Sequence, residues 1–386
     1  MTTVYYDAWS CFNEKYFSSG GAFNYYNNLT TVYVGNTVVY WNDVFSGVST
    51  IETIEFDSGS MLKEIGDSAF KGLVKLTDFD IPNTVTKIGD NAFDGCNLLA
   101  IVLPDGLLTI GNYAFNGCSG LTKVDLPNNV TEIGSYAFAN CTSLEEFNIN
   151  DDSQLNTILK GAFQSTALQS FKFTANLQNV ENILFNGCQS LATVYYNITE
   201  LQNDYKVSRM FENVTSLTTI IIEEGVMDIP AIFACASAVK SITIPSTVTN
   251  ISSFGFGECT ALETVNWNAV ECKLYGTIFN SCENITTFVF SDSVEVIPDY
   301  LLSGGLSVTN MVIPAMVREI GEKCFWYCEQ LTSVRFENPN GWYVKSSRFT
   351  DVKQELDSSD LADPTKAAQL LTDKKTYATM IWYRAE

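Results

Sequence analysis

The chain carries 11 cysteines and no histidine, and these counts limit the chemistry it could perform. Without an imidazole, a Ser or Cys nucleophile lacks its usual base and a metal site lacks a common ligand. The run Asp57–Gly59 imitates the Asp-Ser-Gly loop of an aspartic protease, but that reaction needs two such loops facing each other. No phosphate-binding G-x-x-x-x-G-K-[ST] run occurs. We expect no enzyme activity, no metal and no cofactor.

Most of the cysteines belong to an internal repeat. Its anchors are spaced 22 to 26 residues apart, at Phe23, Phe45, Phe70, Phe93, Phe115, Phe138, Phe163, Phe185, Phe211, Phe233, Phe256, Phe279, Leu302 and Phe325. Such a period predicts a solenoid of stacked units and not a string of separate domains. Seven cysteines lie three residues after an anchor, at Cys96, Cys118, Cys141, Cys188, Cys259, Cys282 and Cys328.

These cysteines could form a disulfide ladder or a metal site, or they could fill the core. Neighbouring units can bring two such Cα atoms within bonding range, so geometry alone permits disulfides. Other units, however, place Val48, Leu73 or Thr166 at the same position. A position that accepts those residues favours a small, mostly apolar filler, which a free thiol is. We expect Cys96, Cys118 and Cys141 to be structural.

The units share the pattern L-x-x-V-x-L-P-x-x-V-T-x-I-G-x-x-A-F-x-G-C, whose part up to the anchor is seen in Leu121–Phe138. Its first part alternates like a half-buried strand, the Val-Thr-x-Ile-Gly part turns back along the far side, and Ala-Phe-x-Gly-Cys is typical of a single helical turn. Phenylalanines at the anchor are predicted to form a buried column, represented by Phe70, Phe93, Phe115, Phe138, Phe163 and Phe256.

This pattern resembles the BspA-like class of leucine-rich repeats, from about Phe23 to Phe336. The resemblance implies an α/β-type repeat solenoid: a right-handed superhelix with one long parallel β-sheet and a mostly irregular or short-helical convex side. It also implies a bacterial-type cell-surface protein, often an adhesin.

The two ends depart from the period, which predicts three regions. Residues 1–22 form an N-terminal cap or degenerate repeat, residues 23–337 form a solenoid of about fourteen repeats, and residues 338–386 form a C-terminal capping segment. In the last region, Asp363-Pro364 predicts the start of a short helix, and a strand-like run ends the chain.

The start of the chain leaves two interpretations open. Met1 stands where the first strand leucine of a repeat belongs, so either a degenerate cap strand opens the chain or a longer precursor has been cut. A removed signal peptide fits the second interpretation, because MTTVYYDAWS itself lacks the pattern of one.

The charge balance limits the partners. Lys and Arg number 22 against 44 Asp and Glu, which gives a formal net charge of −22. Such a surface repels phosphate backbones, so we expect no nucleic acid partner. No apolar run reaches the ~20 residues of a membrane span, and we expect no direct membrane insertion.

The sheet face offers the candidate binding residues. Strand alternation turns two residues per unit outward. In the N-terminal half these include Asp78, Asp80 and Asp125, and in the C-terminal half Tyr195, Ile221, Val289 and Val312. Exposed apolar residues on a rigid sheet favour contact with another molecule. They are equally explained by the good strand propensity of such residues.

The function expected from the sequence is recognition without catalysis. We expect a secreted or cell-surface scaffold, or adhesin, that binds an extracellular or host protein through the curved sheet. The alternative is a module that captures glycans, indicated by the Thr, Ser and Asn ladder with tyrosines. An enzyme is a distant third possibility.

Overall fold

The computed structural model describes residues 2–6, 23, 25–201, 210–304, 306–350, 352–373 and 376–385. Cys11 and most of the predicted N-terminal region 1–22 lie outside the described residues. The chain divides into two compact units. Unit 1 runs to Ala192, and Leu201 also belongs to it; unit 2 comprises Thr193–Glu200 and the described residues from Met210 onward. Each unit is described by itself.

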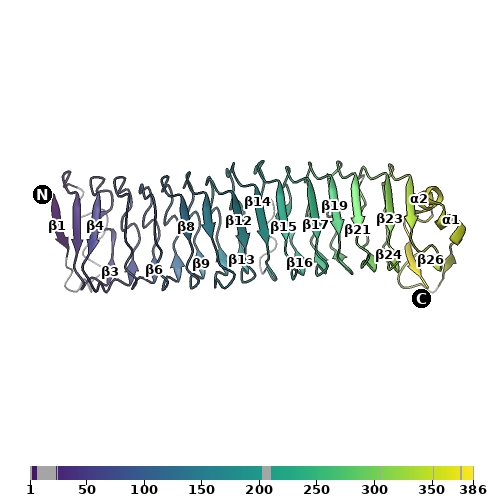
Figure 1. The fold of residues 1–386 in the computed structure, drawn as a ribbon, viewed down its shortest axis with the longest axis horizontal. Coiled ribbons are helices and arrows are strands. Elements are labelled where there is room, and N and C mark those ends of the chain that lie inside the picture. Colours follow the sequence, from purple (N-terminus) through teal and green to yellow (C-terminus); the bar gives the residue numbers. More distant parts are fainter. Residues whose placement is uncertain are drawn as a thin grey trace. The chain divides into compact units, whose positions relative to one another are not determined.

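Unit 1 contains two rows of parallel strands on opposite sides of each turn (Figure 1). The long strands are β1 (Thr3–Tyr6), β2 (Thr31–Val34), β4 (Thr53–Phe56), β8 (Lys123–Asp125), β10 (Glu146–Asn148) and β12 (Ser170–Phe173). The short strands are β3 (Tyr40–Trp41), β5 (Glu64–Ile65), β6 (Lys87–Ile88), β7 (Thr109–Ile110), β9 (Glu132–Ile133), β11 (Thr157–Ile158) and β13 (Asn179–Val180).

Unit 2 repeats this arrangement. Its long strands are β14 (Thr193–Tyr196), β15 (Thr219–Ile222), β17 (Ser241–Ile244), β19 (Thr264–Trp267), β21 (Thr287–Phe290), β23 (Asn310–Ile313) and β25 (Ser333–Phe336). Its short strands are β16 (Asp228–Ile229), β18 (Asn250–Ile251), β20 (Lys273–Leu274), β22 (Val296–Ile297) and β24 (Glu319–Ile320).

The predicted fold class, a leucine-rich-repeat solenoid with parallel strands, is confirmed, and two details differ from the expectation. First, the Val-Thr-x-Ile-Gly part is a second row of strands. In unit 1 these form one parallel ladder of seven strands, from β3 to β13. Second, the long-strand row is not one continuous ladder. The paired parts of this row within unit 1 are β1-β2-β4, the pair β8-β10 and a single bridge between Asp80 and Val102.

In unit 1, glycine lets the short strands from β5 to β9 stack closely. At the position after these strands, a Cβ on Gly134 would lie 2.5 Å from the carbonyl carbon of Gly111, and one on Gly111 would lie 2.6 Å from that of Gly89. Only glycine fits such an approach without displacing backbone. The same position donates its N–H to the short strand of the preceding repeat, as from Gly134 to the carbonyl of Ile110 at 2.8 Å.

The segment around the anchor is a turn and not the predicted helical turn. The residues two before and two after the anchor often have left-handed backbone, for example Tyr136 (φ 56°) and Asn140 (φ 59°) around Phe138. Left-handed residues interrupt a right-handed helix. Within the described residues, 3₁₀ helix is assigned at this place only in η1 (Asp43–Phe45) and η3 (Ala231–Phe233).

The anchors form the core of each unit. In unit 1, Phe93, Phe115 and Phe138 have no exposed area, and their rings are stacked with centroids 5.1 Å apart. Phe70 and Phe163 extend this column on either side. In unit 2, Phe256 stacks between Phe233 and Phe279 at 5.6 and 5.7 Å.

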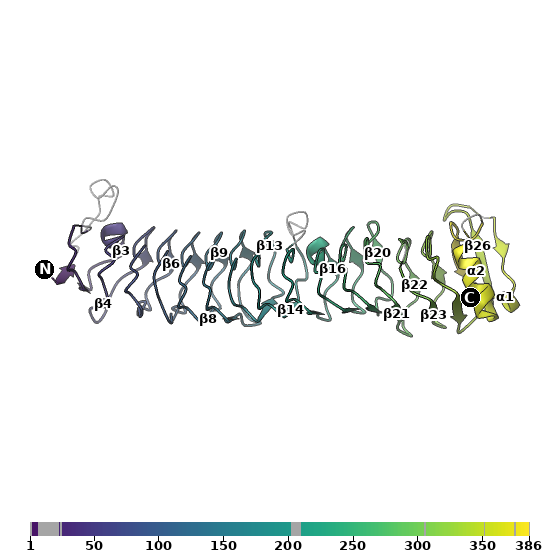
Figure 2. The same ribbon diagram turned by 90° about the horizontal axis from the view of Figure 1, so that it is seen from above.

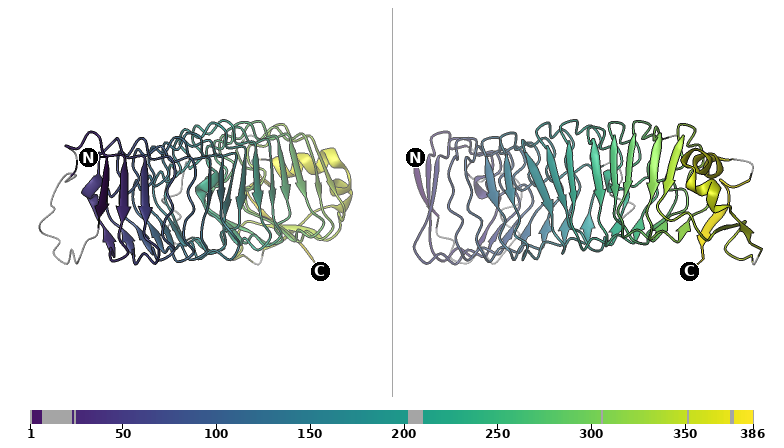
Figure 3. Two further views of the ribbon diagram at one scale, coloured as in Figure 1. Left: turned by 60° about the vertical axis from the view of Figure 1, so that its left-hand side comes forward. Right: turned by 45° about the vertical axis from the view of Figure 1, so that its right-hand side comes forward.

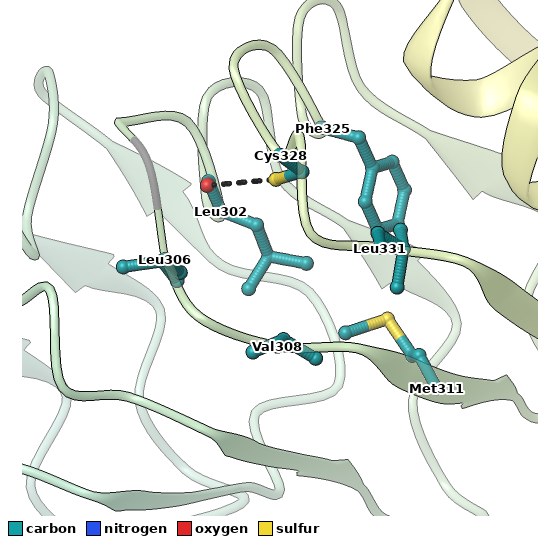
Figure 4. A pocket seen from close by; sticks show the side chains of 7 residues that line it. All are labelled: Leu302, Leu306, Val308, Met311, Phe325, Cys328 and Leu331. Atoms are coloured by element: carbon teal, nitrogen blue, oxygen red, sulfur yellow. Dashed lines mark hydrogen bonds between the residues drawn. The ribbon is translucent and has the colours of Figure 1, made fainter.

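The column of unit 2 has a gap at Leu302, which stands where other repeats place phenylalanine. Beside it lies an apolar pocket with no space for a water molecule. Figure 4 shows the side chains that line it: Leu302, Leu306, Val308, Met311, Phe325, Cys328 and Leu331. The smaller leucine accounts for this local loss of packing.

Unit 2 ends in a mixed segment (Figures 2 and 3). Its elements are β26 (Trp342–Lys345), β27 (Gln354–Glu355), α1 (Ser358–Ala362), α2 (Pro364–Thr372) and β28 (Ile381–Arg384). Helix α2 begins as the sequence predicts, with the Asp363 carboxylate accepting the N–H groups of Thr365 and Lys366, and it packs on β25. Strand β28 pairs antiparallel with β24, and Trp342 and Trp382 are buried.

Candidate functional site

The long strands of unit 2 place four candidate residues on one sheet face. Strand residues alternate between buried and solvent-facing positions, so Val194 and Ile220 enter the core while Tyr195 and Ile221 face outward. In the register of β14 and β15, Tyr195 lies directly beside Ile221. We call the outward side chains of the long strands β14, β15, β17, β19, β21, β23 and β25 the long-strand face of unit 2.

Three aliphatic side chains on this face remain exposed to water. Ile221, Val289 and Val312 are 38%, 49% and 38% exposed, respectively, and Tyr195 is half-buried. Val289 and Val312 lie on contacting strands, β21 and β23. Removing exposed aliphatic groups from water lowers the free energy, so this face suits contact with another molecule.

The four residues form two apolar spots and not one continuous patch. Between them, β17 and β19 present Thr243 and Asn266 at the equivalent positions, and the Asn266 side chain donates to the Thr243 hydroxyl at 3.3 Å. The parallel row of outward residues carries hydroxyl groups, such as Thr219, Ser241 and Thr287. The face therefore mixes apolar spots with hydrogen-bonding groups, as protein interfaces do.

The predicted acidic residues lie on the long-strand side of unit 1. Asp78, Asp80 and Asp125 are all exposed. The Asp125 carboxylate accepts a hydrogen bond from the Asn148 amide at 2.7 Å, which lowers its pKa, and Lys123 at 3.3 Å acts in the same direction. Lys123 therefore partly neutralises this acidic strip.

Sequence reasoning missed an aromatic pair in unit 1. Tyr5 and Tyr33 face outward from β1 and β2, with stacked rings 4.8 Å apart, and Tyr5 is 77% exposed. The similarity of MTTVYYD to LATVYYN placed Tyr5 in phase with Tyr195 and was sufficient to find the pair.

The in-phase cysteines make a repeated contact that the sequence did not reveal. Each of the seven thiols donates to the carbonyl of the anchor one repeat earlier; in unit 1, for example, Cys96 donates to Phe70 at 3.0 Å, Cys118 to Phe93 at 3.2 Å and Cys141 to Phe115 at 3.1 Å. The thiol is thus a hydrogen-bond donor as well as a filler. Where the position holds Thr166, its hydroxyl donates instead to the carbonyl of Phe163, the anchor of its own repeat.

The thiols whose pKa is raised by burial are poor candidates for chemistry. All ten cysteines in the described residues are free and buried. Burial raises the pKa of Cys96 and of Cys141 to about 12. A thiol with such a pKa stays protonated at neutral pH, and the thiolate is the reactive form. No group of three or more metal-ligating side chains is placed to hold an ion among the described residues.

These features define a class of protein: a parallel solenoid of 22- to 26-residue turns with a phenylalanine column. The sequence matches the BspA type leucine rich repeat region in 6 copies, over residues 15–72, 63–192, 153–231 and 230–354. The chain belongs to this family, as its repeat pattern predicted. Leucine-rich repeats are scaffolds typical of protein interaction and are generally not enzymes.

Several solved structures are similar to this chain. A leucine-rich repeat protein from Bacteroides ovatus is 20% identical, with 82% of this chain and 86% of that chain covered and a TM-score of 0.46. A leucine rich cell surface protein from Faecalibacterium prausnitzii is 22% identical, with 81% and 74% covered and a TM-score of 0.33. The pneumococcal vaccine antigen PcpA is 17% identical, with 81% and 63% covered and a TM-score of 0.29. No curated protein matches the chain.

Proposed function

We propose that this protein is a non-enzymatic recognition scaffold, secreted or held at the cell surface, that binds an extracellular protein through the long-strand face of unit 2. The exposed apolar residues Ile221, Val289 and Val312 carry this proposal. They stand on a strand scaffold whose other face is fixed in the core. Binding therefore needs little ordering of the backbone, which favours affinity. The described residues contain no helix long and apolar enough to cross a membrane.

The charge distribution supports a division of roles. The net charge of −22 attracts basic partners, and salt screens this attraction. The exposed carboxylates of Asp78 and Asp80 in unit 1 would contribute to this attraction, while the apolar spots of unit 2 would hold the partner in place. Reversing both aspartates to lysine should then change the association rate more than the dissociation rate.

The experiment is a binding screen of the intact protein against immobilised extracellular matrix proteins and against polysaccharides. The proposal expects saturable binding to at least one protein, weakened by salt. It also expects Tyr195→Ala combined with Ile221→Ser to weaken that binding while the thermal unfolding curve stays unchanged. Binding to polysaccharides alone would instead favour the glycan-capturing alternative. Binding that survives the double substitution would exclude this part of the face.

A further inference from the structure

A second, polar site lies on the short-strand side of unit 2. It is a pocket of about 760 Å³ among the ends of β18, β20, β22 and β24. Its lining includes Asn250, Tyr275, Asp299, Arg318 and Arg348. None of these residues lies on the long-strand face, so the pocket is distinct from the surface of the proposed function.

The pocket forms where the short-strand ladder is interrupted. β20 pairs with β18, and β22 pairs with β24, but β20 and β22 do not pair. In the regular turns the residue after the short strand donates its N–H to the preceding repeat, as Gly321 does to the carbonyl of Ile297 at 2.8 Å. Pro298 occupies this position after β22 and has no N–H to donate. The backbone of Val296 donates instead to Val270, three residues before β20.

A change of residue type makes the pocket polar. Glu271 occupies the repeat position that Val248 holds in the preceding repeat and Val294 in the following one. Both valines are fully buried. The carboxylate cannot take that place in the core, and Glu271 is exposed instead. Leu274 of β20 is consequently only half-buried, whereas Ile251 at the same place in β18 is fully buried.

The charges in the pocket are paired with one another. The guanidinium of Arg318 contacts Glu271, and its Nε lies 3.2 Å from a carboxylate oxygen of Glu295. Arg348 donates to both carboxylate oxygens of Asp299 at 3.0 Å and to Glu319 at 2.8 Å. These planar groups are held in place before any ligand arrives, and forked ion pairs of this kind have well-defined geometry.

The chemistry of this lining indicates its ligand. A cation would meet two guanidinium groups and Lys273, and an anion would meet the three carboxylates of Glu271, Asp299 and Glu319. An uncharged polyol can donate to the carboxylates and accept from the arginines without separating the ion pairs. Tyr275, 65% exposed, adds a flat apolar ring on which the C–H face of a sugar can rest. The volume lies within the range of small-molecule sites. We propose that this pocket binds neutral sugar units of a glycan.

The test uses an array of neutral and anionic oligosaccharides, followed by titration calorimetry with the neutral hexasaccharide that gives the strongest signal. Two variants probe the pocket: Tyr275→Ala removes the ring, and Glu271→Ala removes an exposed acceptor. Tyr40→Ala is the matched control, because Tyr40 is an exposed tyrosine on a short strand of unit 1. Thermal unfolding of each variant verifies that it folds.

The proposal expects saturable binding of a neutral oligosaccharide that each pocket variant weakens by about tenfold or more and that Tyr40→Ala leaves unchanged. Three results would overturn it: no neutral oligosaccharide binds, only anionic ones bind, or binding persists in both folded pocket variants. The protein-binding face shares no residue with this pocket, so the two proposals succeed or fail separately.

Discussion

At the scale of the residue, the repeated cysteine provides a donor that an aliphatic filler cannot. The thiol of Cys118 is buried and donates to the carbonyl of Phe93. The same carbonyl also accepts the backbone N–H of Cys96 at 3.0 Å, so the thiol is its second donor. Thr166, at the same position of its repeat, also donates, but to the carbonyl of its own anchor Phe163.

We predict that Cys118→Ala lowers the free energy of unfolding by about 0.5–1.5 kcal/mol, the net contribution of one hydrogen bond. Cys118→Ser, which retains a donor of similar size, should lose less. Denaturant unfolding followed by circular dichroism measures both. If Cys118→Ser lost as much stability as Cys118→Ala, the donor role would be contradicted and the thiol would act only as a filler.

At the scale of the element, the short strands from β5 to β9 are each followed by a glycine that permits close stacking. A Cβ on Gly134 would meet the backbone of Gly111 and Asn112 at 2.5 and 2.6 Å. Backbone cannot move aside as a flexible side chain can, so the turns would have to separate. Gly106 lies in the neighbouring loop, where an added Cβ would meet nothing closer than 3.9 Å.

Gly134→Ala should thus destabilise unit 1 by about 3 kcal/mol or more, in the range of severe core changes. Gly106→Ala should be neutral or slightly stabilising, because alanine restricts the unfolded chain. The comparison of the two melting temperatures isolates the clash from the general effect of replacing glycine. Similar melting temperatures would contradict the close stacking of the short strands.

The sequence predicted this fold well because one packing solution is repeated many times. The phenylalanine interval located the core column, and strand alternation placed Ile221 and Val289 outward. Contacts between repeats were harder to predict. The donation from Cys118 to Phe93 and the opening at Pro298 depend on how one turn sits on the next, and a single unit of sequence does not specify that geometry. The sequence did contain one indication of the polar pocket, which is Glu271 at a repeat position where the neighbouring repeats have valine.

At the scale of the whole molecule, the buried thiols link stability to pH. Burial raises the pKa of Cys96 and Cys141 to about 12. In the unfolded chain a thiol has a pKa near 8.5. Between these values the unfolded state loses protons that the folded state retains, so stability falls as the pH rises from about 9 toward 12.

Replacing Cys96, Cys118 and Cys141 together by serine should flatten this alkaline loss, since serine does not titrate in the range. The measurement is the free energy of unfolding at several pH values above 8, compared between wild type and variant. The expected difference in slope is up to about 1.4 kcal/mol per pH unit for each thiol removed. Parallel curves would exclude the thiols as the cause of the alkaline instability.

The central claim is that a protein partner binds the long-strand face of unit 2. The most direct test is surface plasmon resonance with a matrix protein identified in the binding screen. It compares the variant Ile221→Ser/Val289→Ser/Val312→Ser with Met227→Ser/Met316→Ser, which changes two exposed apolar residues next to the short strands of the same unit. We predict that the triple variant dissociates at least about tenfold faster while the methionine variant matches the wild type. Loss of binding in the methionine variant, with the triple variant unaffected, would contradict the claim.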